Sequence, residues 1–232
     1  MKKRIFTSVM GGLVAATMLV SVSEPSLAEE CGFNVSLAQK SNNRGDSGTT
    51  SIKTPITEAS IGITCGNFDA SLFGMYNNNS GMINEVDVSF GYSFSKDDFR
   101  GRVGLSRWMY EENGGKNDAF DLNVYYSGLP VDLGVGITKI LDDKGTQITG
   151  SVSKRFEIGE IDDTKFTLTP SARFTYLDEF FGLSGHSNDV YGLSLGVDKG
   201  NFGVDFSVDH HRGHKKELSN DTKFGITFRY NF

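Results

Sequence analysis

The sequence predicts an all-β fold: a transmembrane, antiparallel, up-and-down β-barrel of about twelve strands. Three observations support this prediction: an export signal at the N-terminus, short segments in which apolar and polar side chains alternate, and connections that alternate between short and long. The mean hydropathy of −0.28 is compatible with a membrane location. Only alternate residues of a barrel strand face lipid, so each span is half polar.

The first 28 residues have the organisation of a secretory signal. Basic residues occupy positions 2–4, an apolar stretch covers positions 11–20, and Ser26-Leu27-Ala28 provides a small-x-small cleavage site. A transmembrane anchor is the alternative, but two glycines interrupt the stretch and no stop-transfer flank follows it. We therefore expect residues 1–28 to be a signal peptide and residues 29–232 to form one barrel domain.

Period-two alternation divides the remaining chain into segments whose apolar residues share one parity. The even count places both termini on the periplasmic side, although the Gly- and Asn-rich second and third segments leave ten strands as an alternative. The expected segments are Phe33–Leu37, Ala59–Ile63, Phe68–Tyr76, Val86–Phe94, Phe99–Leu105, Phe120–Tyr126, Val131–Ile137, Ile148–Phe156, Phe166–Tyr176, Tyr191–Val197, Phe202–Val208 and Phe224–Phe232.

The connections orient the barrel, because outer-membrane barrels combine short periplasmic turns with longer extracellular loops. Gly66-Asn67 and Lys199-Gly200 are short, and Gly159–Thr164 is the longest connection on the same side. On the other side we expect long loops at Asn42–Thr57, Asp178–Asn188 and His211–Asn220.

A soluble β-sandwich or a lipocalin-like barrel would also contain alternating strands. In a soluble protein the apolar parity would face a core and the other parity would face water. That other parity is rich in Gly, Ser, Thr and Asp, and so many glycines would be unusual on a soluble surface. The pattern favours the membrane barrel, with the apolar parity outward.

The last strand carries Phe228, Tyr230 and the terminal Phe232 on one face. With the signal peptide, this tail resembles those of Gram-negative outer-membrane proteins. The resemblance implies insertion in the outer membrane after signal cleavage, contact with lipid and lipopolysaccharide, and recognition of the tail by the barrel-assembly machinery. In size and strand number the chain is similar to small monomeric twelve-stranded channels, such as porins specific for acidic oligosaccharides. No sequence motif of theirs is present, so the resemblance does not supply a substrate.

The two cysteines, Cys31 and Cys65, begin the first expected strand and end the second. In an antiparallel hairpin they meet at the periplasmic end on the same face. The oxidising periplasm favours a structural disulfide between them.

Charged residues of both signs occupy the inward parity. They can line a pore with a transverse field, or they can form internal salt bridges that close a narrow barrel. Inward glycines, which leave space unfilled, favour an open lumen. The expected lining includes Arg100, Arg102, Arg155, Arg173, Arg229 and Lys223, facing Asp69, Asp87, Asp121, Asp132, Asp198 and Asp205.

We therefore hypothesise passive diffusion of small hydrophilic solutes, without a cofactor or covalent chemistry. Anionic solutes are favoured because several of the arginines fall in the periplasmic half. The formal net charge of −6, more negative once residues 1–28 are removed, argues against nucleic acid as a partner.

Two alternatives remain open: a surface adhesin or structural barrel, and a membrane hydrolase. Gly185-His186-Ser187-Asn188 loosely resembles the His-x-Ser-Asn pattern of the outer-membrane phospholipase family but lacks the intervening residue. Arg44-Gly45-Asp46-Ser47, in the first expected outer loop, contains the tripeptide that integrins read on some adhesins.

Two further groups of residues are expected near the outer rim. All four histidines, His186, His210, His211 and His214, fall in the last two expected outer loops, where they form either a metal site or a solvated polar surface. Outward Arg107 and Lys139 are expected to meet lipopolysaccharide phosphates or to extend toward water.

Overall fold

The computed structural model describes residues 31–44, 51–52, 54–110, 115–142, 145–215, 218 and 220–232. The expected signal peptide lies outside these residues. Of the Arg44-Gly45-Asp46-Ser47 string, only Arg44 lies inside them. None of the described residues forms a helix that is long and apolar enough to span a membrane.

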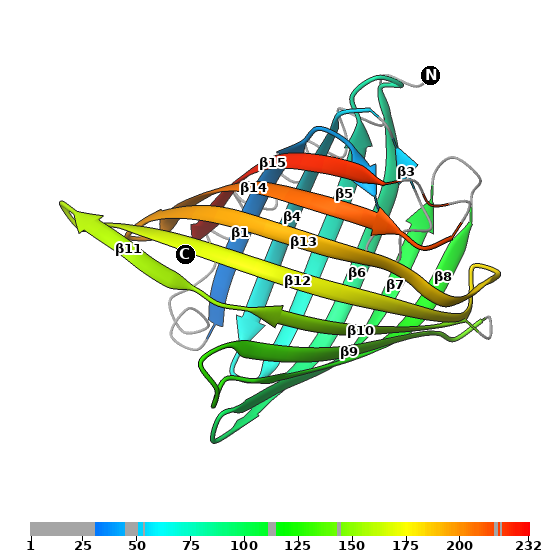
Figure 1. Cartoon of the computed structure of the whole chain (residues 1–232), viewed down its shortest axis with the longest axis horizontal. Coiled ribbons are helices and arrows are strands. Elements are labelled where there is room, and N and C mark those ends of the chain that lie inside the picture. Colours follow the sequence, from blue (N-terminus) through cyan, green and yellow to red (C-terminus); the bar gives the residue numbers. More distant parts are fainter. Residues whose placement is uncertain are drawn as a thin grey trace.

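The described residues form a closed antiparallel barrel of twelve strands, with one additional strand (Figure 1). This confirms the predicted class and excludes ten strands. The barrel strands are β1 (Cys31–Lys40), β4 (Ile56–Cys65), β5 (Phe68–Asn77), β6 (Met82–Lys96), β7 (Phe99–Tyr110), β8 (Lys116–Tyr126), β9 (Asp132–Ile140), β10 (Thr146–Ser153), β12 (Thr164–Phe180), β13 (Leu183–Lys199), β14 (Phe202–Gly213) and β15 (Asp221–Asn231). The additional strand is β11 (Phe156–Ile161), and β2 (Asn43–Arg44) pairs with β3 (Ser51–Ile52) between β1 and β4.

Two pairings close the ring. Each strand otherwise pairs with its neighbours in sequence order, while β1 pairs with β15 from Asn34↔Asn231 to Lys40↔Gly225, and β10 pairs with β12. Beyond the last strand, the amide of Phe232 donates to the carbonyl of Phe33 at 2.8 Å. Closure leaves neither β1 nor β15 with an unpaired edge, which a bilayer would not tolerate.

The apolar parity faces outward, as predicted. Phe68, Phe90 and Phe224 are 65%, 61% and 60% exposed, although they are among the most apolar residues of the chain. Their exposure is compatible with stability only if lipid covers the wall of the barrel.

The expected strand Ile148–Phe156 is wrong, because the structure divides it. β10 ends at Ser153, opposite Ser171, and β11 begins at Phe156, opposite Leu168. Pro170 lies between these two pairs and accepts a hydrogen bond from the amide of Lys154 at 3.2 Å. Proline has no N–H to return a second bond, so the ladder is interrupted there.

The expected turn Gly159–Thr164 is also shorter than predicted. β11 continues to Ile161, and the chain reverses at Asp162-Asp163, both of which have positive φ angles. The β11–β12 hairpin extends beyond the ring at the end of the barrel where β13 ends (Figure 1).

Two expected outer loops are largely strand. β12 runs to Phe180, the chain turns at Phe181-Gly182, and β13 begins at Leu183, so the segment read as a loop from Asp178 to Asn188 is a hairpin. Two register shifts interrupt its ladder, between Thr175 and Tyr176 and between Leu177 and Phe180. Such irregularities break the period-two pattern, so sequence alternation did not predict the hairpin. β14 likewise continues to Gly213.

The disulfide between Cys31 and Cys65 is present. The two residues are direct partners in the β1–β4 ladder, with their Cα atoms 4.2 Å apart. The bond joins the first barrel strand to its neighbour at the end of the barrel that carries the short turns, which we call the periplasmic end after the expected orientation.

Replacing both cysteines by Ser is expected to lower the free energy of unfolding by about 3 kcal/mol, because the bond closes a loop with a sequence separation of 34. Urea unfolding in detergent micelles, followed by fluorescence of the single tryptophan, Trp108, measures the change. Wild-type protein unfolded under reducing conditions is the control and is expected to match the variant. Equal stability of the oxidised wild type and the variant would contradict the prediction.

Candidate functional site

The periplasmic half of the barrel interior contains ion pairs that pass over an intervening strand. Arg102 on β7 reaches Asp69 on β5, and its Nε lies 3.0 Å from both carboxylate oxygens. The strand between them is β6, where Gly91 is the partner of Asp69 in the ladder. The guanidinium therefore lies along the wall of the barrel instead of projecting into the lumen.

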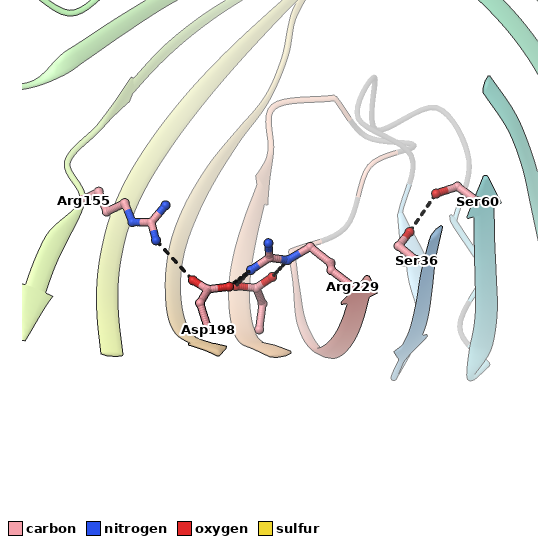
Figure 2. A network of polar contacts seen from close by, with 6 residues as sticks. Ser36, Ser60, Arg155, Asp198 and Arg229 are labelled. Carbon is pink, nitrogen blue, oxygen red and sulfur yellow. Dashed lines mark hydrogen bonds and ion pairs between the residues drawn. The ribbon is translucent and has the colours of Figure 1, made fainter. Parts of the chain in front are cut away.

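A second network has the same arrangement. Arg229 on β15 donates from Nε to Asp205 on β14 at 2.6 Å and from Nη2 to Asp198 on β13 at 3.0 Å. Arg155, between β10 and β11, reaches the other oxygen of Asp198 at 3.2 Å. Figure 2 shows the two arginines converging on Asp198 from opposite sides. On the neighbouring strands β1 and β4, Ser36 and Ser60 share a hydrogen bond of 2.7 Å (Figure 2).

Several inward glycines lie beneath these side chains. A Cβ atom on Gly91 would lie 2.4 Å from the Arg102 guanidinium, and one on Gly203 would lie 2.5 Å from Asp198 Oδ1 and 2.9 Å from Arg229 Nη2. The inference that these glycines leave space unfilled is therefore wrong at these two positions. Neighbouring arginines and aspartates occupy that space, and the missing side chain is what allows an ion pair to lie flat across a strand.

Part of the lumen is open. A cavity of about 470 Å³ lies inside the wall formed by β8–β10 and β12–β15. Its charged lining side chains are Arg173, Lys223 and Asp209, with Lys223 Nζ 4.0 Å from Asp209 Oδ2. Uncharged polar side chains supply much of the remaining lining: Asn123, Tyr125, Thr138, Gln147, Thr149, Ser151, Ser153 and Ser171.

The two sides of the ring differ in charge. Glu58, Glu85 and Asp87 have inward parity on β4 and β6. In the strand order β6 lies opposite β13, and the cavity with Arg173 and Lys223 is on that opposite side. Glu58 is ion-paired with Lys40 of β1, so Glu85 and Asp87 are the acidic residues that distinguish this side of the lumen.

An apolar cluster narrows the outer end of the lumen. Ile140, Leu177 and Phe180 are almost fully buried and pack with Trp108 and Leu183. The rings of Trp108 on β7 and Phe180 on β12 are 6.5 Å apart, although β8, β9 and β10 lie between these strands in the sheet. The contact must therefore cross the interior of the barrel.

Sequence reasoning missed this cluster. The available signal was the appearance of large apolar residues, Trp108, Ile140 and Leu177, in the parity that is otherwise polar, at the outer ends of three strands. A single inward apolar residue is uninformative, and only the closed ring brings Trp108 of β7 into contact with Phe180 of β12.

Arg100 and Asp121, which were also predicted to line the pore, lie outside the two ion-pair networks described above. Arg100 lies at the periplasmic mouth, where its Nη2 donates to Ser127 Oγ at 3.3 Å, and it shares a second cavity of about 460 Å³ with Arg102. Asp121, at mid-height, accepts hydrogen bonds from Ser106 at 3.0 Å and from Thr138 at 2.7 Å. The terminal aromatics Phe228, Tyr230 and Phe232 are 44%, 41% and 58% exposed on the outer wall.

The string that resembles a phospholipase motif is not in a loop, contrary to the expectation. His186 and Ser187 belong to β13. Ser187 is fully buried at a register shift, whereas His186 Nε2 bonds to Asp189 Oδ1 at 2.7 Å. The histidines are likewise on or beside strands: His210 and His211 lie in β14, and His214 directly follows it.

The architecture can be compared with that of known proteins. No protein-family model and no curated protein sequence matches this chain. Among solved structures, the KdgM porin is similar over 86% of this chain and 99% of its own, with a TM-score of 0.60 and 13% identity. The fold is that of a small, twelve-stranded, porin-like outer-membrane barrel.

Two further porin structures share this fold. A KdgM porin in complex with disordered oligogalacturonate covers 87% of this chain and 99% of its own, with a TM-score of 0.56 and 12% identity. The NanC porin covers 85% and 98%, with a TM-score of 0.53 and 11% identity. Similarity at these sequence identities shows that the fold is porin-like. It does not indicate a substrate, which has to be inferred from the residues that line the lumen.

Gly91→Ala is expected to destabilise the porin-like barrel by up to about 1 kcal/mol, because the added methyl group must displace the Arg102 guanidinium and so weakens its ion pair with Asp69. Gly150→Ala is the matched control, since a Cβ there meets no atom within 4 Å. Urea unfolding of both variants in the same micelles measures the difference. If Gly150→Ala costs as much as Gly91→Ala, the loss comes from the strand glycine itself and not from the ion pair.

Proposed function

We propose that this porin-like barrel is a channel for passive diffusion of small hydrophilic solutes. The observation that carries the proposal is the polar cavity of about 470 Å³ inside a closed ring of twelve strands. Hydroxyl and amide side chains line it and can exchange hydrogen bonds with a passing solute, as water does. The flat ion pairs Arg102–Asp69 and Arg229–Asp205 support the proposal because they hold these two arginine side chains along the wall of the barrel.

We further propose a preference for anionic solutes. Two basic side chains, Arg173 and Lys223, and one acidic side chain, Asp209, line the cavity. Farther toward the periplasm, Arg102, Arg155 and Arg229 are each bonded to aspartates, which reduces their contribution to selectivity. The proposed preference therefore rests on the net positive charge of the side chains that line the cavity.

We infer the cellular location of this function from the sequence pattern together with the barrel fold. Residues 1–28 direct export, and the tail Phe228, Tyr230, Phe232 is read by the barrel-assembly machinery of a Gram-negative bacterium. At the outer rim, Arg107 is paired with Asp118 at 2.6 Å and Lys139 with Thr146 at 3.2 Å. Both side chains are of the lipid-facing parity, where they would meet lipopolysaccharide phosphates.

The channel is tested by inserting the purified mature chain into a planar lipid bilayer. Discrete conductance steps are expected in symmetric salt, because a polar cavity lies within the lumen. Protein denatured before addition provides the background. Folded protein that inserts without producing steps above this background would exclude the channel and favour a structural barrel.

Replacing Arg173 and Lys223 by Ala is expected to shift the reversal potential under a salt gradient toward cation selectivity, because both charges line the cavity. Arg107→Ala is the matched control: it also removes a positive charge, but one on the outer wall that is bonded to Asp118. Unchanged selectivity in the double variant, or an equal shift in Arg107→Ala, would refute the assignment of these two residues.

Phe180→Ala is expected to increase single-channel conductance, because Phe180 crosses the lumen toward Trp108 and narrows the outer end. Phe174→Ala is the control, since Phe174 is also on β12 but is 45% exposed on the lipid-facing wall. The two variants are compared in the same bilayer and salt. A conductance equal to that of wild type in Phe180→Ala would show that the apolar cluster does not limit flow.

A further inference from the structure

Two imidazoles and one carboxylate converge on the outer wall of the barrel, away from the lumen. His186 Nε2 lies 2.7 Å from Asp189 Oδ1, and His214 Nε2 lies 2.8 Å from Asp189 Oδ2. The two rings are stacked with their centroids 4.0 Å apart. Three ligand atoms of these residues, one from each, lie within 4.8 Å of one another.

The β12–β13 register places this cluster on the lipid-facing surface of the barrel, near its extracellular end. His186 is paired with Tyr176, and Asp189 is paired with Phe174. Phe174 and Tyr176 are 45% and 51% exposed on the outer wall. Phe174 and Tyr176 are lipid-facing aromatic residues near the extracellular end of β12. The cluster lies at the same level, where the wall of the barrel meets the membrane interface.

The backbone holds the three groups in place. Ser187 forms a register shift in β13, so His186 and Asp189 project to the same side although three positions separate them. The amide of His214 donates to the Ser187 carbonyl at 2.8 Å, which fixes the segment after β14 against β13. The Asp189 side chain is only 8% exposed, whereas the His186 side chain is 47% exposed, so an ion can approach from outside.

We propose that His186, Asp189 and His214 bind a divalent transition-metal ion, with Zn²⁺ as the best-fitting ion. Two imidazole nitrogens and one carboxylate oxygen are a common zinc ligand set, and water completes a tetrahedron. In such a site the ligand atoms are separated by about 3.3 Å, given metal–ligand distances of about 2.0–2.1 Å. The two imidazole rings are stacked with an interplanar angle of 21°, so their side chains must rotate and tilt apart before both Nε2 lone pairs point at one ion.

The proton balance of binding is simple. Without metal, each Nε2 donates to the carboxylate, which accepts on both oxygens. On binding, each neutral imidazole carries its proton on Nδ1 and presents the Nε2 lone pair to the ion. The carboxylate gives up the two hydrogen bonds and contributes an oxygen. The ion then joins β13 to the segment that follows β14, and so stabilises the outer rim.

The test uses the mature chain without a histidine tag, folded in micelles and freed of metal with a chelator. Zn²⁺ is titrated in competition with a chromophoric chelator. One ion per chain is expected, with affinity reduced by more than about tenfold in His214→Gln and in Asp189→Asn. Ca²⁺ and Mg²⁺ are not expected to compete, because they prefer oxygen ligands.

His210→Gln is the matched control. His210 lies on β14, the strand next to β13, and bonds to Thr222 at 3.1 Å. It is therefore not part of the cluster. X-ray absorption of the zinc-loaded protein provides a second measurement, in which the number of histidine ligands is expected to fall from two to one in His214→Gln. Absence of zinc binding in wild type, or equal affinity in wild type and His214→Gln, overturns the proposal. An equal loss in His210→Gln also overturns it, because binding would then be a property of dispersed surface histidines.

Discussion

The pairing of β1 with β15 is the interaction on which the rest of the structure depends. Within a bilayer no water is available to satisfy free backbone groups, so a sheet must close on itself. The Cys31–Cys65 disulfide joins β1 to β4 at the periplasmic end, and the register from Asn34↔Asn231 to Lys40↔Gly225 completes the ring. Once the ring is closed, every strand has one face toward lipid and one toward the lumen.

Closure also determines how charges can be accommodated inside. Arg102 and Arg229 would obstruct a narrow lumen if their side chains were extended toward its axis. Each instead crosses a neighbouring strand at a glycine, over Gly91 in one case and over Gly203 in the other, and reaches an aspartate beyond it. The glycines and ion pairs form one structural unit, in which the partly buried charges have partners and the two arginine side chains lie along the wall.

The interior differs along its length. The periplasmic half contains flat ion pairs, the middle contains a polar cavity, and the outer end contains the apolar contact between Trp108 and Phe180. If the barrel conducts as we propose, a solute that enters from outside meets an apolar narrowing before it reaches Arg173 and Lys223. Hydrophobic constrictions oppose the passage of water and ions, so this narrowing and the charged walls together define the selectivity that we propose.

The sequence by itself determined the barrel class, the outward parity of residues such as Phe224 and Phe228, and the pairing of Cys31 with Cys65. These features follow from local alternation and from the order of strands along the chain. The ends of the strands were not predictable, because Pro170 and the register shifts near Tyr176 and Ser187 interrupt the period of two. The tertiary structure alone decided which inward residues meet. Asp198 receives Arg155 and Arg229, and Trp108 meets Phe180, only after the sheet has curved, because the strands that carry these residues are not consecutive in the chain.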